Sequence, residues 1–229
     1  MSAVPALDEL RADAERAGLA WRGAFHPLAA DAVPPLEGGA RAGTLVLLGF
    51  VGGGEWPAFA ASAEYLDGGP DPLDRWSRRV IGALGARHGA AALFPFDGPP
   101  WLPFQRWAVR AEAVHVSPLG VLIHPDWGLW HAYRGALALR ARIALPPRDR
   151  RGSPCTSCVG RPCERSCPVA AVTPAGYDAA ACARHVAAPA GRDCLAEGCR
   201  ARRACPVGAA HRYPAAQAGF HMRAFLRAR

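Results

Sequence analysis

Apolar positions follow two different spacings along the first two thirds of this chain. Residues 44–51 begin with Thr-Leu-Val-Leu-Leu-Gly-Phe, an apolar run of strand length flanked by glycines, which predicts a buried strand. Residues 73, 76, 80, 81 and 84 are apolar at helical spacing and follow Asp71-Pro72, which predicts a helix with proline in its first turn.

The same criteria predict the remaining elements. Further helices are expected at 6–18, 55–66 and 103–113, and after Pro214. An extended segment at 19–25 and strands at 90–96, 119–124 and 129–140 are also expected. Because strands and helices are mixed without regular βαβ repeats, the predicted fold class is α+β.

The composition changes once along the chain. All seven tryptophans lie before residue 131, whereas all eight cysteines lie after residue 154. Between them, residues 146–154 form a polar stretch bracketed by prolines, which is typical of a linker between domains. The sequence therefore predicts one domain at 1–147 and a second at 148–229, the latter ending in the helix after Pro214.

The cysteines form two related runs, and each run ends in Cys-Pro. The ferredoxin pattern C-x2-C-x2-C-x3-C-P, used twice, places two 4Fe-4S clusters so that the fourth cysteine of each run binds the other run's cluster. This spacing predicts one cluster on Cys155, Cys158, Cys163 and Cys205, and another on Cys182, Cys194, Cys199 and Cys167. Two extra residues separate Cys158 from Cys163, so the loops are not those of a minimal ferredoxin.

Two other uses of eight cysteines are weighed against this interpretation. Paired zinc sites also use CxxC spacing, but they usually combine two such pairs, and only one CxxC is present. Four disulfides require an oxidising compartment, whereas the chain begins with a charged helical pattern that has no apolar signal segment. We therefore expect iron–sulfur clusters in a cytoplasmic protein.

The charge and hydropathy of the chain bear on whether nucleic acid or a membrane is an expected partner. The formal net charge is +8, and all 27 basic residues are arginine. Two oxidised clusters would offset this charge by about −4, so the charge does not call for a nucleic-acid partner. No apolar run approaches the roughly 20 residues that cross a bilayer, and no membrane span is expected.

Residues 118–135 contain a further motif, Gly120-Val-Leu-Ile-His124-Pro-Asp-Trp-Gly-Leu-Trp130, followed by Arg134-Gly135. This run resembles that of the cobalamin-processing chaperones of the CblC type. It is also similar to a run in epoxyqueuosine reductase, in which a double 4Fe-4S segment follows, as here. The resemblance implies a flavin-reductase-like (nitroreductase-like) first domain, followed by a small ferredoxin-type domain with two clusters.

The resemblance also implies roles for single residues. Gly120, His124, Trp130 and Arg134 match the CblC-type run and would bind a corrinoid or its thiol cosubstrate. Asp97, in Asp-Gly-Pro-Pro, is similar to the catalytic proton donor of epoxyqueuosine reductase. Each residue has a simpler interpretation as well: Asp97 as a turn residue, His124 as a structural histidine, Trp130 as core and Arg134 as the partner of a carboxylate.

These observations lead to one expected function and two alternatives. The expected function is that of an oxidoreductase in which two 4Fe-4S clusters pass electrons to a bound corrinoid, either to process it or to reduce a small-molecule substrate through it. The alternatives are a ferredoxin-like electron carrier without catalysis and a flavin reductase that uses FMN. The expected protein partner is an electron donor such as a flavodoxin, a ferredoxin or a reductase.

Overall fold

The computed structural model describes residues 7–173 and 176–228. The chain divides into two compact units, which are treated separately below. The first is Met1–Glu112 with Ala132–Arg150, called the sheet unit, and the second is Ala113–His131 with Arg151–Arg229, called the cysteine unit. Ala6, the first residue of the helix predicted at 6–18, lies outside the described residues.

The sheet unit is built on four strands in the order β1-β2-β6-β3. Strand β1 pairs antiparallel with β2, and β3 pairs antiparallel with β6. Helices and an antiparallel sheet occur together, so the α+β class is confirmed. The strands are β1 (Ala20–Phe25), β2 (Thr44–Val51), β3 (Ala91–Leu93) and β6 (His131–Leu139).

Strand β2 has the bounds that its apolar run predicts, and it lies between β1 and β6. Residues 45–48 have no exposed surface, which is expected of a central strand covered on both faces. Gly49 is required here, because a Cβ at this position would lie 1.9 Å from the carbonyl oxygen of Ala132. The glycine therefore allows the backbones of β2 and β6 to pack closely.

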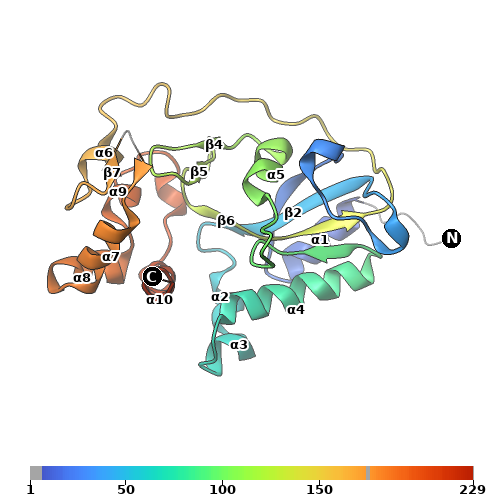
Figure 1. Cartoon of the computed structure of the whole chain (residues 1–229), viewed down its shortest axis with the longest axis horizontal. Helices are drawn as coiled ribbons and strands as arrows, with labels where there is room; N and C mark the ends of the chain where they lie inside the picture. Colours follow the sequence, from blue (N-terminus) through green and yellow to red (C-terminus); the bar gives the residue numbers. More distant parts are fainter. Residues whose placement is uncertain (1–6, 174–175, 229) are drawn as a thin grey trace. The chain divides into compact units, whose positions relative to one another are not determined.

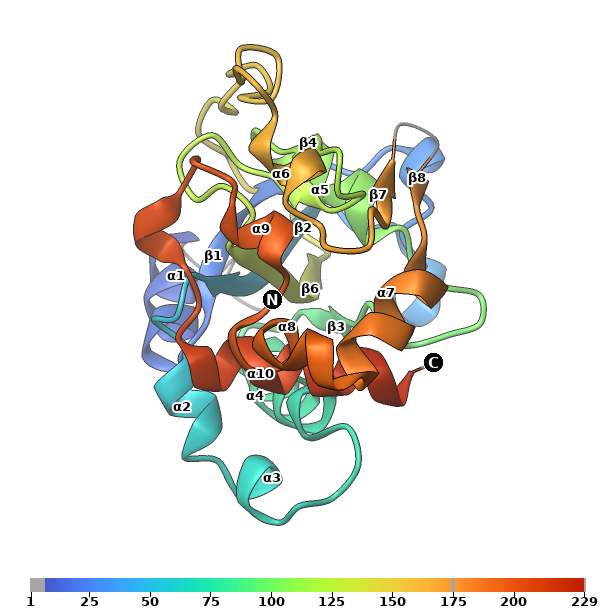
Figure 2. The same cartoon turned by 90° about the vertical axis from the view of Figure 1, so that its left-hand side faces the viewer.

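Helices of the sheet unit cover the sheet. In both views, α4 and α5 lie on opposite sides of it (Figures 1 and 2). The helix predicted at 55–66 is two short helices, because Ser62 has an extended backbone and its hydroxyl accepts a hydrogen bond from the Tyr65 N–H, which starts a new helix. The helices are α1 (Leu7–Arg16), α2 (Trp56–Ala60), α3 (Ala63–Leu66), α4 (Pro72–Arg87) and α5 (Phe104–Ala111).

A charged group lies in the core of the sheet unit. Arg22 in β1 has no exposed surface, and its guanidinium donates to the Glu112 carboxylate at 2.6 Å and to the carbonyl oxygen of Phe50 at 2.9 Å. Tyr133 also donates to Glu112, and its ring lies 4.6 Å from the Arg22 guanidinium. The pairing offsets the large cost of burying an isolated charge.

The cysteine unit consists of short helices and two small hairpins. Strands β4 (His115–Val116) and β5 (Leu122–Ile123) form one hairpin, and β7 (Val172–Thr173) and β8 (Gly176–Tyr177) form the other. Helix α10 packs against α7 and α8, while α6 packs against α9. The helices are α6 (Pro162–Arg165), α7 (Ala179–Ala187), α8 (Arg192–Glu197), α9 (Arg200–Arg203) and α10 (Ala215–Arg227).

The compact units differ in one segment from the predicted domains at 1–147 and 148–229. Residues 113–131, which contain most of the Gly120–Arg134 motif, belong with the cysteines. Arg151 forms a paired contact with the Asp126 carboxylate at 2.6 and 2.7 Å, and its carbonyl oxygen lies 3.0 Å from His115 Nε2. Residues 142–153 contain no helix or strand, as is typical of a linker.

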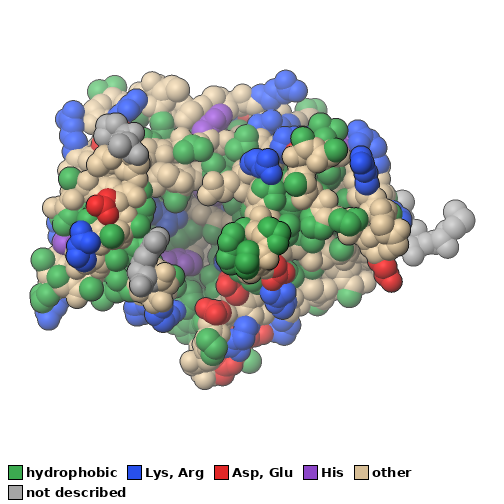
Figure 3. Space-filling model, in the orientation of Figure 1, with side chains coloured by type: hydrophobic (Ala, Val, Ile, Leu, Met, Phe, Trp, Pro, Cys, Tyr) green, Lys and Arg blue, Asp and Glu red, His purple; other side chains and the backbone are tan. Residues whose placement is uncertain are grey.

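Among the described residues, no helix combines the length and the apolar character needed to cross a membrane. The face shown in Figure 3 mixes apolar, basic and acidic side chains. Over α3 and α4 the charged groups form pairs, including Arg79 with Glu64 at 2.5 Å and Arg75 with Asp67 at 2.7 Å.

Candidate metal centre

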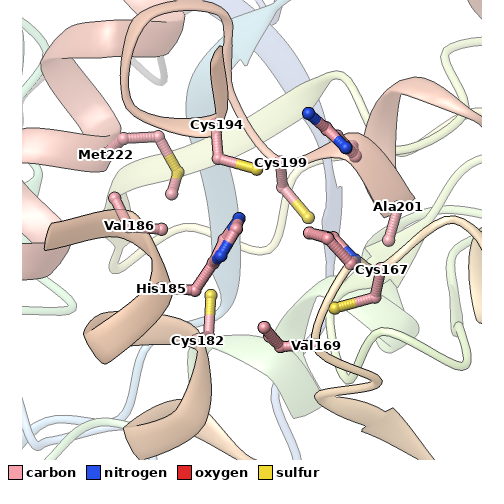
Figure 4. Close-up of a pocket in the computed structure, with 11 residues that line it drawn as sticks. Cys167, Val169, Cys182, His185, Val186, Cys194, Cys199, Ala201 and Met222 are labelled. Atoms are coloured by element: carbon pink, nitrogen blue, oxygen red, sulfur yellow. The ribbon is translucent and has the colours of Figure 1, made fainter. Parts of the chain in front are cut away.

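Four cysteines surround one cavity in the cysteine unit. The side chains that line the cavity point into a common space (Figure 4). Three of these cysteines belong to the second run of the sequence, and one belongs to the first run. They are Cys167, Cys182, Cys194 and Cys199, here called the second cysteine set.

Each member of the second cysteine set comes from a different element. Cys167 lies two residues beyond α6, Cys182 is in α7, Cys194 is in α8, and Cys199 immediately precedes α9. These helices are short, and α10 packs across α7 and α8. Tertiary packing therefore brings together four thiols that span more than thirty residues of sequence, since Cys167 and Cys199 are the outermost of them.

Backbone N–H groups point at several of these sulfur atoms. The Ala171 N–H donates to Cys167 Sγ at 3.3 Å. Cys199 accepts from the N–H groups of Arg202 and Ala201, and Cys194 accepts from that of Arg200. Hydrogen bonds of this kind favour a thiolate over a thiol, and thiolates are the form in which cysteine binds metals.

The other four cysteines form a second group of neighbours, here called the first cysteine set: Cys155, Cys158, Cys163 and Cys205. Burial raises the pKa of Cys163, and the nearby thiols of Cys205, Cys155 and Cys158 raise it further. Cys205 packs with Ile123 and Leu129 in an apolar cluster to which Cys155 also belongs. Thus Cys205, from the end of the second run, lies with the cysteines that begin the first run.

Cys167 thus lies with three cysteines of the second run, and Cys205 lies near three cysteines of the first run. All eight are free cysteines in this structure. Burial also raises the pKa of Cys155, Cys182, Cys194, Cys199 and Cys205.

Zinc sites and iron–sulfur clusters require different separations between the cysteine sulfur atoms. No three His, Cys, Asp or Glu side chains of the described residues are grouped closely enough to hold a single metal ion. A tetrahedral zinc site with Zn–S bonds of about 2.3 Å requires its sulfur atoms within about 3.8 Å of each other. In a 4Fe-4S cluster, by contrast, each thiolate binds a separate metal atom, so its sulfur atoms lie farther apart.

His124 lies at a turn in the cysteine unit. It is buried, and its Nδ1 accepts a hydrogen bond from the Asp126 N–H at 3.1 Å. Its ring stacks on Trp127 with 3.9 Å between ring centres. Gly120 occupies a nearby turn at φ +74°, where its N–H donates to the carbonyl oxygen of Ser117. These contacts are those of a structural histidine and a turn glycine.

Trp130 is buried against an arginine of the cysteine-rich segment. The Arg202 guanidinium lies 4.7 Å from the Trp130 ring centre and 4.6 Å from that of Tyr213. Arg202 Nε also donates to the carbonyl oxygen of Leu129 at 3.1 Å. The arginine therefore connects residues 129–130 to α9, between Cys199 and Cys205.

Two glycines allow close backbone contact beside the first cysteine set. A Cβ on Gly128 would lie 1.9 Å from the carbonyl oxygen of Val207, and one on Gly208 would lie 2.2 Å from the carbonyl carbon of Trp127. The His124–Gly128 turn therefore packs directly on the segment that follows Cys205. Part of the conspicuous 118–135 motif is used for packing around a cysteine site.

Asp97 and Arg134 lie in the sheet unit, and both form ion pairs. Asp97 accepts two hydrogen bonds from Arg78, whose guanidinium also lies over the rings of Phe94 and Phe96. Arg134 in β6 pairs with Asp74 of α4, and its Nε donates to Ser77 at 3.0 Å. The structure thus divides the predicted corrinoid-binding residues: Gly120, His124 and Trp130 lie in the cysteine unit, and Arg134 does not.

Sequence analysis missed His185, which lines the cavity of the second cysteine set. The signal was available, because His185 follows Cys182 by three residues within one helix, a spacing that places both on the same face. Arg202 was also missed, since one arginine among many gave no sign of its aromatic partners.

A scan against protein-family models found no match, and a search of curated proteins found no similar sequence.

Proposed function

We propose that each cysteine set binds one 4Fe-4S cluster and that the protein transfers electrons. The observation that supports this most directly is the crossed grouping. Cys167 of the first run lines a cavity with Cys182, Cys194 and Cys199, while Cys205 of the second run lies near Cys155, Cys158 and Cys163. This exchange is the arrangement of two-cluster ferredoxins.

The surroundings of the thiols support the same proposal. Bound clusters would supply reversible electron exchange at potentials set by burial, charge and hydrogen bonds. The N–H groups of Ala171, Ala201 and Arg202 provide hydrogen bonds to sulfur. Ile123 and Leu129 exclude water near Cys205.

The electron acceptor that we propose is a corrinoid, bound for processing or used to reduce a substrate. Support comes from the resemblance of residues 118–135 to the CblC-type run, and the flavin-reductase-like fold of the sheet unit is part of the same proposal. On this proposal Asp97 is the proton donor, and Gly120, His124, Trp130 and Arg134 bind the corrinoid or its cosubstrate.

A specific observation favours a second candidate, the ferredoxin-like carrier. Asp97 pairs with Arg78, Arg134 pairs with Asp74, and Trp130 is buried beneath Arg202. These contacts give structural roles to the predicted proton donor and to two of the predicted corrinoid-binding residues, and a carrier requires only the cysteine unit. An FMN-dependent flavin reductase is the third candidate and is compared in the same experiment.

For the electron donor we propose a protein with an acidic surface, acting in the cytoplasm. An open hollow in the cysteine unit is lined by Arg200, Arg203 and Arg212. Asp193 pairs with Arg200 at 2.5 Å and with Arg203 at 2.9 Å. The excess of arginine over carboxylate in this hollow is complementary to a negatively charged partner.

The test is anaerobic reconstitution followed by cofactor titration. Two four-iron clusters predict about eight irons per chain and a broad visible absorption that is bleached by dithionite. A protein that takes up zinc alone would contradict the proposal. The reconstituted protein is then titrated with cobalamin and, separately, with FMN. A perturbed corrinoid spectrum supports the first candidate, a perturbed flavin spectrum supports the third, and no response to either supports the carrier.

A further inference from the structure

His185 lies at the second cysteine set, but it is not one of the proposed cluster ligands. Its side chain lines the cavity with the four thiols, and Figure 4 shows the ring among the sulfur atoms. Its Nε2 atom is buried and has no hydrogen-bond partner among the described residues. A buried polar atom without a partner is destabilising, so such atoms are rare unless they have a function.

The backbone holds His185 in this position. Asp178 caps the N-terminus of helix α7, because its carboxylate accepts a hydrogen bond from the Ala181 N–H at 2.9 Å. At the other end, the carbonyl oxygen of His185 accepts from the Ala188 N–H at 3.0 Å. Gly191 approaches the same oxygen so closely that a Cβ there would lie 2.0 Å from it. The imidazole is thus presented to the cavity by an element fixed at both ends.

The other polar side chain that lines the cavity has a partner. Arg200 Nε donates to the Asp193 carboxylate at 2.5 Å. The four thiols already provide one ligand for each iron of a four-iron cluster. His185 is therefore not needed as a fifth ligand, and the role left for it is a hydrogen bond to the cluster.

We infer that His185 donates a hydrogen bond from Nε2–H to a sulfur atom of the cluster held by Cys167, Cys182, Cys194 and Cys199. The inference rests on the proposed function. Reduction adds one electron to a group that is already negatively charged, so the N–H donor stabilises the reduced state more than the oxidised one. The proton stays on the nitrogen, and His185 makes this cluster easier to reduce.

The test compares His185→Phe, which lacks a donor, with His185→Gln, which keeps an N–H group. The holoprotein is first assayed for iron, and each cluster is then titrated with a reductant at controlled potential and followed by EPR. We expect His185→Phe to lower the reduced-to-oxidised ratio of one cluster about five-fold at a fixed potential, the effect of losing one hydrogen bond. His185→Gln should restore much of that ratio.

Two references make the measurement specific. The cluster of the first cysteine set provides an internal reference, and its ratio should not change. His211→Phe replaces a partly exposed histidine of the same unit that does not line the cavity, and it should leave both ratios unchanged.

The contrary results are distinct. An unchanged ratio in His185→Phe with about eight irons per chain overturns the hydrogen-bond role. Loss of about four irons in both His185→Phe and His185→Gln, with the fold retained by circular dichroism, overturns it in favour of a direct ligand. Wild-type protein that takes up no iron overturns the proposed function, and this inference with it.

Discussion

Arg202 connects two parts of the cysteine unit that are far apart in sequence. Its guanidinium lies over the rings of both Trp130 and Tyr213, and it donates to the carbonyl oxygen of Leu129. Two aromatic faces and a backbone acceptor use the planar, delocalised charge that distinguishes arginine from lysine. One side chain thus stabilises the packing of residues 129–130 near the cysteines.

Replacing Arg202 should destabilise the cysteine unit. We expect Arg202→Ala to lower the free energy of unfolding by about 1–2 kcal/mol, because cation–π contacts and a hydrogen bond are lost together. Arg202→Lys should fall between this variant and wild type. Urea unfolding followed by tryptophan fluorescence measures the difference. The control is Arg227→Ala, an exposed arginine at the end of α10, and an equal loss in both variants would refute the prediction.

Glu64 is the residue for which we make a pH prediction. The Arg79 guanidinium beside it lowers the pKa of this carboxyl from 4.5 to about 2. Because the pKa is lower in the folded state, the pair stabilises the fold fully above about pH 4.5 and loses its effect as the pH falls towards 2. The carboxyl carbon resonance of Glu64 should therefore titrate near pH 2. In Arg79→Gln it should move towards 4.5, and a midpoint that does not respond would show that Arg79 is not the cause.

At the scale of elements, the His124–Gly128 turn and the segment after Cys205 fit together through their backbones. Gly128 has φ +58° and lies against Val207, whereas Gly120 has φ +74° with no atom near the position of a Cβ. The two glycines share a positive φ but differ in their surroundings. Substitutions at the two positions therefore distinguish the effect of backbone strain from the effect of a steric clash.

Gly128→Ala should displace the Cys205 segment and remove one cluster. We expect iron to fall from about eight to about four per chain, because only the first cysteine set contains Cys205. Gly120→Ala is the matched control, since it adds strain of about 1 kcal/mol without a clash and should retain all the iron. Iron analysis after anaerobic reconstitution measures both. Equal iron in the two variants would mean that the turn does not support the site.

For the whole cysteine unit, the decisive feature is the exchange of one cysteine between the two runs. Cys167 and Cys205 each end a run, and each lies with the cysteines of the other run. The second cysteine set therefore lies within the sequence span of the first, yet the two sets form separate groups in the fold.

Paired substitutions test this exchange. Cys155→Ala with Cys205→Ala should lose no more iron than either change alone, about four per chain, because both residues serve one cluster. Cys155→Ala with Cys167→Ala should lose nearly all of it. If the runs acted independently, Cys155 and Cys167 would instead behave as one set, and Cys155 and Cys205 as two. Iron content and the EPR signal of the reduced protein distinguish the two patterns.

The sequence alone determined the elements that depend on local pattern. The apolar run at 44–51 is β2, Pro72 begins α4, and the segment after Pro214 is α10. The Cys-Pro runs also predict two crossed sets of cluster ligands, and that assignment stays a prediction. These features are short-range, and a single sequence records them directly.

Only the tertiary structure decided what those elements contact. Residues 119–124 read as a strand of the first domain, but only Leu122–Ile123 form a strand, which pairs with β4 in the cysteine unit. The reason is the backbone contact of Gly128 with Val207 and the packing of Arg202 over both Trp130 and Tyr213, which join residues some eighty positions apart. His185 likewise acquires its place from helix packing. Such contacts depend on which surfaces meet, and no local pattern of apolar and polar residues encodes that.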